Sequence, residues 1–354
     1  MSSFVSWGRR SVLLGAAAAG LAFGLAVSGP ARADGELHIY AWSGELPQEI
    51  VDDFEKETGI TVTFDTFDSN ETMMAKLEAG ASGYDIVNPS QYAVQILAKK
   101  GLIEELEHGK IANIGNISEE FRNVSYDPGN KYQIPYLSGS TGLAYNTDCV
   151  KEEVTSWKAL WDEKYKGRIY MLDNMLAAYI AGLQVNGFRA SSTSEAEIAK
   201  ATESLIAQKP LLAGYNSTNF AELVSSGEAC LVEAWSGTVI QVMSENPKVR
   251  YVLPQEGGTM WVDGFSVAKG AANRDNAYKF IDYILKPEVA AKVTKLSKIA
   301  TCVGKSRELL PPEIADNAAI FLPKEQVVKA DFILDAGDAM KFYQDGWTKV
   351  KTAQ

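Results

Sequence analysis

The sequence predicts an α/β protein of two lobes, each with a central sheet flanked by helices, joined by crossing strands. Three observations predict this class. Residues 57–99 alternate strand and helix patterns, strands of the buried type recur at 168–172 and 229–234, and a strand at 259–267 leads the chain back to the first lobe. The length of 354 residues suffices for two domains of ordinary size.

The first lobe is predicted to begin with a strand and a helix. Leu37 and Ile39 alternate with other residues over 36–40, which is the period-2 pattern of a strand. Pro47 then opens a helix, because proline is favoured in a first helical turn, and the helix closes near Gly59. A parallel βα layer is therefore expected from the first residues onward.

The following stretch repeats this order twice. Residues 61–67 alternate as a strand, Ser69 is a good N-cap, and the apolar stripe of the next helix stops at Gly80. Residues 85–87 form a short apolar strand, which turns at Ser90 into a further helix. Ser90 therefore lies where a strand ends and a helix begins, the place at which open α/β sheets bind ligands.

The rest of the chain continues the α/β pattern. We expect two extended crossings between the lobes, at 131–137 and 141–145, and a C-terminal helix at 335–350. Trp157 and Trp161, four residues apart, are expected to pack on one face of a helix. The other helices are expected at 178–186, 195–208, 219–225, 274–285 and 287–296.

The first 33 residues are predicted to be an export signal that is removed. Arg9 and Arg10 precede an Ala/Gly/Leu-rich run over 12–27, and a small-residue cleavage site ends at Ala33. The paired arginines favour the twin-arginine route, and the ordinary secretory route is its close rival. Since no cysteine for a lipid anchor lies near the cleavage site, we expect a protein free in the periplasm.

The charge of the remaining chain is strongly negative. Three arginines and no acidic residue lie in the leader, which leaves 31 basic against 45 acidic residues, a net charge of −14. Such a balance argues against nucleic acid and anionic membranes as partners, and is compatible with cationic ligands. Solubility alone explains the charge equally well.

The three cysteines allow three pairings in an oxidising compartment. Cys149 and Cys302 both follow segments that link the lobes, so we expect these two to pair. Cys230 lies in the apolar segment 229–234 and is expected in the core. No spacing resembles a zinc site, and neither a metal nor a cofactor is expected.

Three of the seven tryptophans lie at predicted strand ends. Trp42 follows the first strand, Trp235 follows 229–234, and Trp261 is two residues from Asp263, so that both of these side chains leave one face of a strand. Indole faces around a carboxylate form a cage for an ammonium group, and each contact is worth up to about 2 kcal/mol when desolvated. This arrangement favours a binding site over core packing.

Neighbouring polar residues extend the predicted site. Ser43, Ser90 and Tyr92 supply hydroxyls at the same edge. Glu45 offers a second carboxylate or is a solvated surface charge, and both interpretations stay open. Glu233, two residues before Trp235, is a further carboxylate on that strand.

The chain resembles the periplasmic spermidine/putrescine-binding proteins, the soluble receptors of ATP-driven polyamine importers. The resemblance spans essentially the whole chain after the leader. It rests on these matches in order: Trp42, Glu57-Thr58-Gly59-Ile60, Ser69-Asn70-Glu71-Thr72-Met73, Ala75-Lys76-Leu77, Tyr84-Asp85-Ile86-Val87, Pro89-Ser90, Ile134-Pro135-Tyr136, Thr155-Ser156-Trp157, Leu160-Trp161, Glu163-Lys164-Tyr165-Lys166-Gly167, Asn216-Ser217, Glu256-Gly257-Gly258, Trp261 and Asp263.

This resemblance implies the type II periplasmic-binding-protein fold. One lobe is expected to comprise about residues 34–140 plus 262–305, and the other 141–261 plus 306–354. Ligand contacts are implied at the matching positions Trp42, Ser43, Ser90, Tyr92, Trp235, Trp261 and Asp263.

The departures from the family pattern concern the charge of the site. Glu45 replaces an aromatic contact, while Asn174 and Ala177 replace acidic residues that hold an amine; Asn174 is kept as a candidate contact. Ile299 and Ile333 stand where the family has tyrosine and glutamine. A buried ammonium without a carboxylate is costly. We therefore expect a ligand with one or two cationic groups, a short diamine slightly ahead of a single-amine zwitterion such as 4-aminobutyrate.

The predicted function is to bind such an amine between two closing lobes and deliver it to an inner-membrane ABC permease, as a monomer. A sensor subunit is not distinguished from a transport component. An enzyme is not expected, because His38 and His108 lie beside no Ser or Cys nucleophile motif. An iron receptor of similar architecture is disfavoured, because the sequence has no adjacent tyrosine pair.

Overall fold

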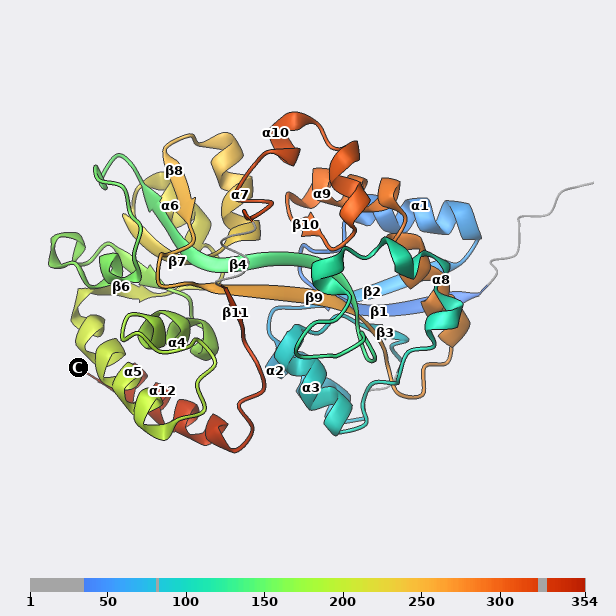
Figure 1. The fold of residues 1–354 in the computed structure, drawn as a ribbon, viewed down its shortest axis with the longest axis horizontal. Coiled ribbons are helices and arrows are strands. Elements are labelled where there is room, and N and C mark those ends of the chain that lie inside the picture. The colour runs from blue at the N-terminus through green and yellow to red at the C-terminus, as the bar shows by residue number, and fades with distance from the viewer. Residues whose placement is uncertain (1–34, 81–82, 324–329, 354) are drawn as a thin grey trace, which may run out of the picture. The chain divides into compact units, whose positions relative to one another are not determined.

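Figure 1 shows the fold of a computed structural model that describes residues 35–80, 83–323 and 330–353. The predicted export signal, residues 1–33, lies outside these described residues. Ala33–Gln354 forms one compact unit, and the following description concerns this unit. None of the helices in its described part has the length and apolar character needed to cross a membrane.

The N-terminal strands form a parallel layer, as predicted. β1 (Glu36–Trp42) pairs with β2 (Thr61–Phe67) on one side and with β3 (Ile86–Val87) on the other. Between β1 and β2 lies α1 (Gln48–Thr58), which ends where Gly59 takes a left-handed φ of 71°. The alternation read from the sequence thus corresponds to real strands.

The next two helices begin at serine residues. Ser69 caps α2 (Asn70–Glu78), because its Oγ accepts a hydrogen bond from the Thr72 N–H at 3.1 Å. Ser90 precedes α3 (Gln91–Lys99) without a side-chain cap of this kind. The Ser90 hydroxyl is therefore available for another partner.

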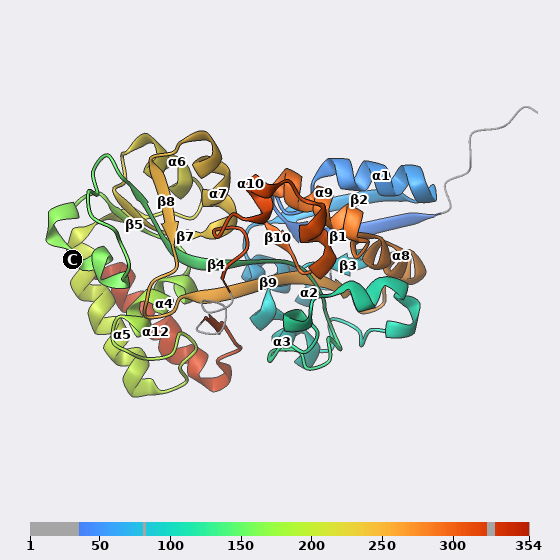
Figure 2. The same ribbon diagram turned by 45° about the horizontal axis from the view of Figure 1, so that its top comes forward.

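Two long antiparallel strands, β4 (Ile134–Asn146) and β9 (Thr259–Val267), lie side by side at the centre (Figures 1 and 2). β9 also pairs with β3, and β4 pairs with β7 (Leu231–Trp235), so these two strands connect the two parts of the sheet. The crossings predicted at 131–137 and 141–145 belong to one strand, β4, which begins at Ile134 rather than at residue 131. The residues between them stay paired with β9, which the local pattern does not reveal.

The later strands continue the same sheet. β5 (Ile169–Met171) pairs in parallel with β6 (Leu212–Tyr215) and with β7. Among the described residues the main strand order is β2-β1-β3-β9-β4-β7-β5-β6. The other strands are β8 (Val249–Val252), β10 (Ala300–Thr301) and β11 (Asp331–Phe332).

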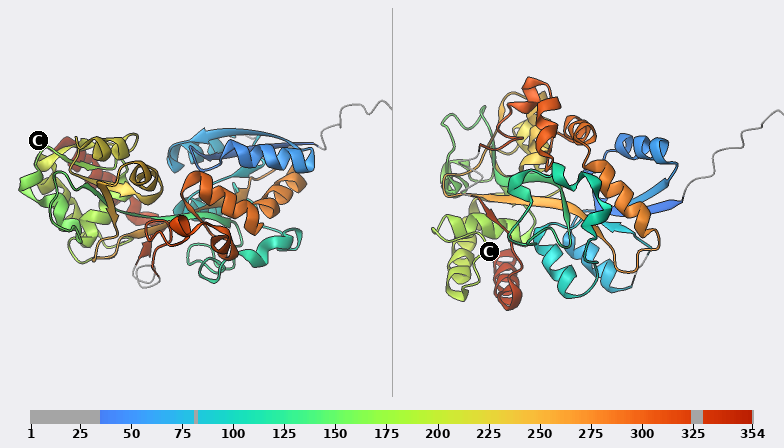
Figure 3. Two further views of the ribbon diagram at one scale, coloured as in Figure 1. Left: turned by 90° about the horizontal axis from the view of Figure 1, so that it is seen from above. Right: turned by 45° about the vertical axis from the view of Figure 1, so that its right-hand side comes forward.

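Helices cover both parts of the sheet. The remaining α-helices of the described residues are α4 (Met175–Gln184), α5 (Glu195–Gln208), α6 (Phe220–Ser226), α7 (Ser236–Glu245), α8 (Arg274–Ile284), α9 (Pro287–Ser297), α10 (Pro312–Ala315) and α12 (Met340–Thr352). Short 3-10 helices lie at His108–Lys110, Ala112–Asn116, Glu119–Phe121, Trp157–Trp161, Glu163–Tyr165, Lys209–Leu211, Gly304–Leu309 and Gly337–Ala339. The red helix α12 lies against α5, as Figures 1 and 3 show.

The buried side chains form two main hydrophobic clusters. The first core draws on β1, β3, α1, α3, α8 and parts of β4 and β9, and includes Phe54 and Phe280 in edge-on contact at 5.1 Å. The second core draws on β5, β7, α4, α5 and α12. There Trp157 is buried and donates from Nε1 to Gln184 Oε1 at 2.7 Å. Ile333 packs against both cores.

The disulfide joins Cys149 to Cys230, with a Cα–Cα distance of 5.8 Å, and the pairing predicted between Cys149 and Cys302 is wrong. Cys302 is a free, buried thiol in the first core. Cys230 precedes β7, where its carbonyl accepts the Asn146 N–H at 3.0 Å at the end of β4. This antiparallel pairing brings the two cysteines together.

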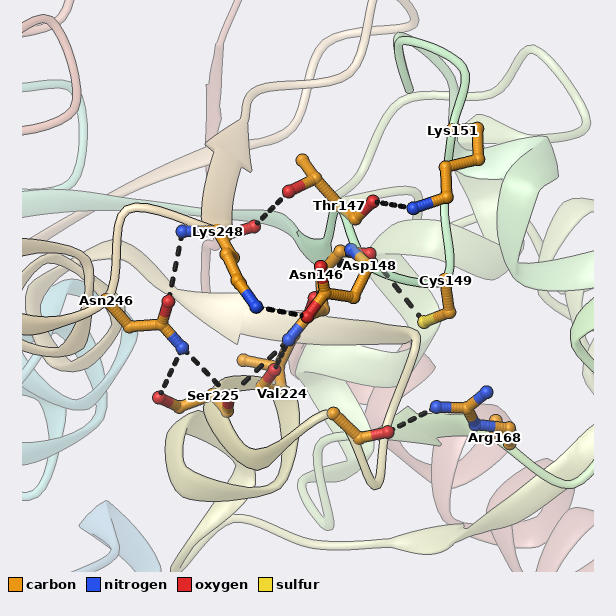
Figure 4. Close-up of polar contacts among 11 residues, drawn as sticks. Asn146, Thr147, Asp148, Cys149, Lys151, Arg168, Val224, Ser225, Asn246 and Lys248 are labelled. Carbon is orange, nitrogen blue, oxygen red and sulfur yellow. Dashed lines mark hydrogen bonds and ion pairs between the residues drawn. The ribbon is translucent and has the colours of Figure 1, made fainter.

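Amide side chains hold the same region in place (Figure 4). Asn146 Nδ2 donates to the Val224 carbonyl at 2.8 Å, and Asn246 Nδ2 donates to the Ser225 carbonyl at 2.9 Å, so both amides bind the C-terminal end of α6. The turn that carries Cys149 is thereby fixed beside β7. The first contact links residues 78 positions apart along the chain, and the second links residues 21 positions apart.

Two helix boundaries differ from the predictions. The helix predicted at 178–186 begins earlier, at Met175, because Asn174 caps it by accepting the Ala177 N–H at 3.0 Å. The C-terminal helix predicted at 335–350 begins at Met340, after the 3-10 turn Gly337–Ala339. Capping and the short 3-10 turn set these limits.

Candidate ligand-binding site

Asp263 is the centre of the candidate site. It lies in β9 with only 5% of its surface exposed. Ser90 Oγ donates a hydrogen bond to Asp263 Oδ1 at 2.5 Å, and the two residues also form an isolated antiparallel bridge. The Ser90 N–H is in turn bound by Asn70 Oδ1 at 3.1 Å. The Ser90 hydroxyl, which makes no capping hydrogen bond to α3, thus positions a buried carboxylate.

Glu45 lies beside this carboxylate. Its side chain is half-buried, and its Oε2 accepts a hydrogen bond from Asn88 Nδ2 at 3.2 Å. The Tyr136 hydroxyl donates to the Glu45 carbonyl at 3.1 Å, which holds the loop after β1 in place. The Glu45 and Asp263 carboxyl groups face each other closely enough to share a proton. Of the two interpretations of Glu45, the structure favours a carboxylate at the site.

Burial governs the titration of this pair. Burial raises the pKa of Asp263 to about 6, and the neighbouring Ser90, Glu45 and Trp42 side chains lower it in part. Burial, followed by the charge of Asp263, holds the pKa of Glu45 well above its usual range. No lysine, arginine or histidine of the described chain forms an ion pair with either group. Without a cation, burial and the mutual repulsion of the two groups therefore favour the protonated form of the pair.

Two indoles lie close to the carboxyl pair. Trp42 ends β1, packs on Phe67 with 4.7 Å between ring centroids, and turns its N–H toward Asp263 without reaching hydrogen-bond geometry. Trp261 lies opposite Gly139 of β4, where a Cβ would come within 2.1 Å of Trp261 Cζ2. The indole therefore lies flat over a position that only glycine accommodates. Both indole N–H groups are buried and lack a hydrogen-bond partner.

The register of β4 brings Trp235 to the same face as Asp263. Asp263 lies opposite Leu137, Trp261 opposite Gly139, and Trp235 opposite Thr141. Alternate residues of a strand share one face, and directly opposite residues in antiparallel pairs do so as well. The acid and two of the three predicted cage tryptophans therefore lie on one face of the sheet.

The other predicted contacts differ in their placement. The Tyr92 hydroxyl donates to Glu71 Oε1 at 2.8 Å, and burial first, then Glu71, raises the pKa of Tyr92, with a smaller contribution from Asp263. Ser43 is exposed in the loop after β1. Asn174 caps α4, and within the described residues no hydrogen bond joins it to the Asp263 carboxylate.

Asn88 is a site residue that the sequence analysis missed. It is fully buried, binds Glu45, and keeps its Oδ1 without a hydrogen-bond partner. The sequence could have indicated Asn88 by its position, directly after β3 and two residues before Ser90. Residues at strand ends of this sheet face the site.

Branched apolar side chains lie where the sequence departs from the family. Ile299 is 8% exposed, and a Cβ on Gly237 would come within 2.9 Å of Ile299 Cγ1 and 3.9 Å of Trp261 Cη2. Ile299 and the Trp261 ring thus both approach the first turn of α7. Neither Ile299 nor Ile333 supplies a polar group there.

The comparisons with known proteins agree with this architecture. A family model of bacterial extracellular solute-binding proteins matches residues 49–322. The spermidine/putrescine-binding periplasmic protein of Salmonella typhimurium is 32% identical over 350 residues, covering 98% of this chain and 99% of that one. The putrescine-binding periplasmic protein SpuD of Pseudomonas aeruginosa is 29% identical over 339 residues, covering 90% and 92%.

Solved structures show the same fold. A putative spermidine/putrescine ABC transporter from Listeria monocytogenes superposes with a TM-score of 0.85 at 31% identity, covering 90% of this chain and 99% of that one. The predicted resemblance and the type II periplasmic-binding-protein fold are confirmed, and these relatives are binding proteins of transport systems rather than enzymes. On sequence and fold together, this chain belongs to the bacterial extracellular solute-binding proteins.

Proposed function

We propose that this protein captures a small cationic amine, putrescine or a close relative, and delivers it to the membrane permease of an ABC importer. The observation that carries the proposal is the pair of the half-buried Glu45 and the buried Asp263, which has no cationic partner in the described chain and lies beside Trp42 and Trp261. An ammonium group placed there favours ionisation of the pair, donates hydrogen bonds to both carboxylates and meets indole faces.

The charge count favours a diamine over a single amine. Glu45 and Asp263 carry two negative charges when both ionise, and a dication neutralises both, whereas a single ammonium leaves one buried charge uncompensated. A zwitterion such as 4-aminobutyrate adds a third carboxylate to the region. The repulsion among these groups disfavours it relative to a short diamine.

The apolar end of the site supports a short ligand. The Ile299 side chain beside Trp261 favours contact with the methylene groups of a ligand over contact with a further ammonium group. The Oδ1 atom of Asn174 is used in capping α4. We expect at neutral pH that spermidine has no tenfold advantage over putrescine.

Capture is proposed to involve closure of two lobes, about residues 34–140 plus 262–305 and 141–261 plus 306–354. The protein is proposed to act as a monomer in the periplasm after cleavage following Ala33, by the twin-arginine or the secretory route. A sensor subunit uses the same binding step, and genetic loss of amine uptake distinguishes transport from sensing.

A ligand screen tests the proposed function. Purified protein is examined by thermal unfolding and titration calorimetry with putrescine, spermidine, agmatine, choline, 4-aminobutyrate and basic amino acids. A ligand at a hundredfold excess over its dissociation constant stabilises the fold by about 2.7 kcal/mol. Spermidine binding tenfold tighter than putrescine and every single-amine compound contradicts the preference for a diamine, and absence of binding to all amines contradicts the function.

A further inference from the structure

Asp263 lies at a gap in the strand pairing of β9. One edge of β9 pairs with β4, so the short strands β3 and β11 pair with the other edge. β11 reaches Met260 and β3 begins at Ser266, and between them the contact of Ser90 with Asp263 is an isolated bridge. Buried backbone N–H and C=O groups in this gap need other partners, because an unpaired group costs about as much as a lost hydrogen bond. Two buried glutamine side chains supply these partners.

Gln91, the first residue of α3, binds the part of the gap that precedes Asp263. The Gln91 side chain is buried, and its Oε1 accepts a hydrogen bond from the Val262 N–H at 3.2 Å. Its Nε2 donates to the Met260 carbonyl at 3.4 Å. Residues two apart in a strand direct their backbone groups to the same edge. The Gln91 carboxamide therefore pairs with β9 as a peptide group of a neighbouring strand would.

Gln133, directly before β4, binds the part of the gap that follows Asp263. It is fully buried, and its Nε2 donates to the Pro89 carbonyl at 2.5 Å and to the Gly264 carbonyl at 3.3 Å. Its Oε1 accepts a hydrogen bond from the Tyr126 hydroxyl at 2.9 Å. A Cβ on Gly264 would come within 2.7 Å of Gln133 Cδ, so glycine at this position lets the carboxamide lie against β9.

The two glutamines thus hold the backbone on both sides of the Ser90–Asp263 pair. Gln91 follows Ser90 in the chain and binds the residue before Asp263. Gln133 binds the residue before Ser90 and the residue after Asp263. With both backbone segments fixed in this way, Ser90 Oγ donates to Asp263 Oδ1 at 2.5 Å.

We propose that Gln91 and Gln133 are positioning residues for amine binding, which hold Ser90 and Asp263 in the register that joins their side chains. The proposal rests on the proposed function and deepens it, because Asp263 is the proposed anchor of the ammonium group. A hydrogen bond donated to a carboxylate favours its ionised form, and the ionised form is the one that binds an ammonium group. The glutamines act on the ligand through this hydrogen bond.

The titration of Asp263 separates positioning from a role in folding alone. Burial raises the pKa of Asp263, and the hydrogen bond from Ser90 lowers it in part. Loss of that hydrogen bond therefore raises the pKa of Asp263 further, and putrescine binding then needs a higher pH. A role in folding alone lowers stability and leaves the pH dependence of binding unchanged.

The other titratable groups around Asp263 permit this measurement. Burial raises the pKa of Tyr92, Tyr126 and Cys302, so these groups stay neutral around pH 7. Burial, followed by the charge of Asp263, holds the pKa of Glu45 well above its usual range. The pH profile of putrescine binding therefore reports the Glu45–Asp263 pair.

Titration calorimetry with putrescine between about pH 5 and pH 8 tests the proposal in protein purified after expression of the full chain. We compare the wild type with Gln91→Met, Gln133→Met, Ser90→Ala and the double variant Gln91→Met/Ser90→Ala. Methionine keeps a similar length and removes the carboxamide. Thermal unfolding verifies that each variant is folded. Gln91→Asn or Gln133→Asn, with a carboxamide one methylene shorter, replaces a methionine variant that does not fold.

Gln208→Met is the matched control. Gln208 ends α5, is fully buried, and donates from Nε2 to the Leu160 carbonyl at 3.1 Å, beside the second core. This substitution also removes a buried carboxamide that binds a backbone carbonyl, but at a place that belongs to the second core. We expect it to lower the midpoint of thermal unfolding and to leave putrescine affinity and its pH profile unchanged.

We expect Gln91→Met and Gln133→Met each to weaken putrescine binding at pH 7 by about fivefold, the effect of one hydrogen bond. Both variants, like Ser90→Ala, should move the midpoint of the pH profile to higher pH. Gln91→Met should weaken binding less in the Ser90→Ala protein than in the wild type, because both substitutions remove the same hydrogen bond to Asp263. The double-mutant cycle is then non-additive.

Three outcomes overturn the positioning role. They are wild-type affinity and pH profile in the folded glutamine variants, an equal change of both in Gln208→Met, or losses of Gln91→Met and Ser90→Ala that add in full. Each leaves the proposed function intact, because the wild type still binds putrescine. Failure of the wild type to bind any amine overturns the proposed function and the positioning role together.

Discussion

At the scale of single residues, the candidate site is defined by carboxyl groups that the fold keeps away from water. Ser90 and Asn88 orient Asp263 and Glu45 through hydrogen bonds of 2.5 and 3.2 Å. Each carboxyl is held at an elevated pKa by burial, and each lacks a cationic partner among the described residues. The site is thus arranged for a positive charge that comes from outside the chain.

Replacing Asp263 by alanine should reduce putrescine affinity by well over tenfold. A charge-assisted hydrogen bond contributes about 1.5–3 kcal/mol, and its removal also leaves a desolvated ammonium with one carboxylate fewer. Trp235→Ala and Trp261→Ala should weaken binding more modestly. Calorimetry measures these losses, with Gly109→Ala, at an exposed position outside the site, as the control. Unchanged affinity in Asp263→Ala would mean that another carboxylate, with Glu45 first, holds the ammonium.

Putrescine affinity should rise with pH. The pKa of Asp263 without ligand is about 6, above the ordinary value of 3.8, and the amine binds the ionised form, so that binding releases a proton. Release of one proton from a group with this pKa raises putrescine affinity by about tenfold between pH 5 and pH 7. Without ligand, the effect of pH on folding stability has the opposite sign. The folded state binds more protons than the unfolded state, so the contribution of Asp263 to stability is present at low pH and is lost as the pH rises through about 6. Equal affinities at pH 5 and pH 7 contradict the assignment.

At the scale of elements, β4 aligns the site. Its alternate residues face Asp263, Trp261 and Trp235 in turn, so one strand fixes the order in which the acid and the indoles meet a ligand. The close approach of Trp261 to Gly139 makes this alignment sensitive to a single methyl group.

Gly139→Ala should displace the Trp261 indole. The new Cβ would lie 2.1 Å from Trp261 Cζ2 and 2.7 Å from Ser236 Oγ, and overpacking of this kind typically costs about 1–3 kcal/mol. We expect a lower midpoint of unfolding, weaker putrescine binding and altered tryptophan fluorescence. Gly109→Ala is the control, because no atom lies within 4 Å of its Cβ position. Equal behaviour of the two variants would show that the indole does not depend on this contact.

At the scale of the whole molecule, two hydrophobic cores share one sheet. β4 and β9 contribute to both parts, and Ile333 packs against each core. If the two cores move as units, a ligand that contacts Asp263 and Trp235 together shifts the population toward the closed form.

Saturating putrescine should compact the protein. Small-angle X-ray scattering of wild-type protein should show a smaller radius of gyration with ligand than without it, because lobe closure brings the two cores nearer. Asp263→Ala at the same putrescine concentration should show no change. Compaction that also occurs in this variant, or none in the wild type, argues against closure around this site.

The sequence by itself determined the local elements and the family. β2, α5 and β9 have the predicted bounds, because alternation and capping depend on neighbours within a few positions. The tertiary structure alone decided the pairing of Cys149 with Cys230, the contact of Glu45 with Asp263, and the continuity of β4. The physical reason is separation along the chain: Ser90 and Asp263 are 173 positions apart, and their hydrogen bond follows from strand order and register, which no local pattern encodes.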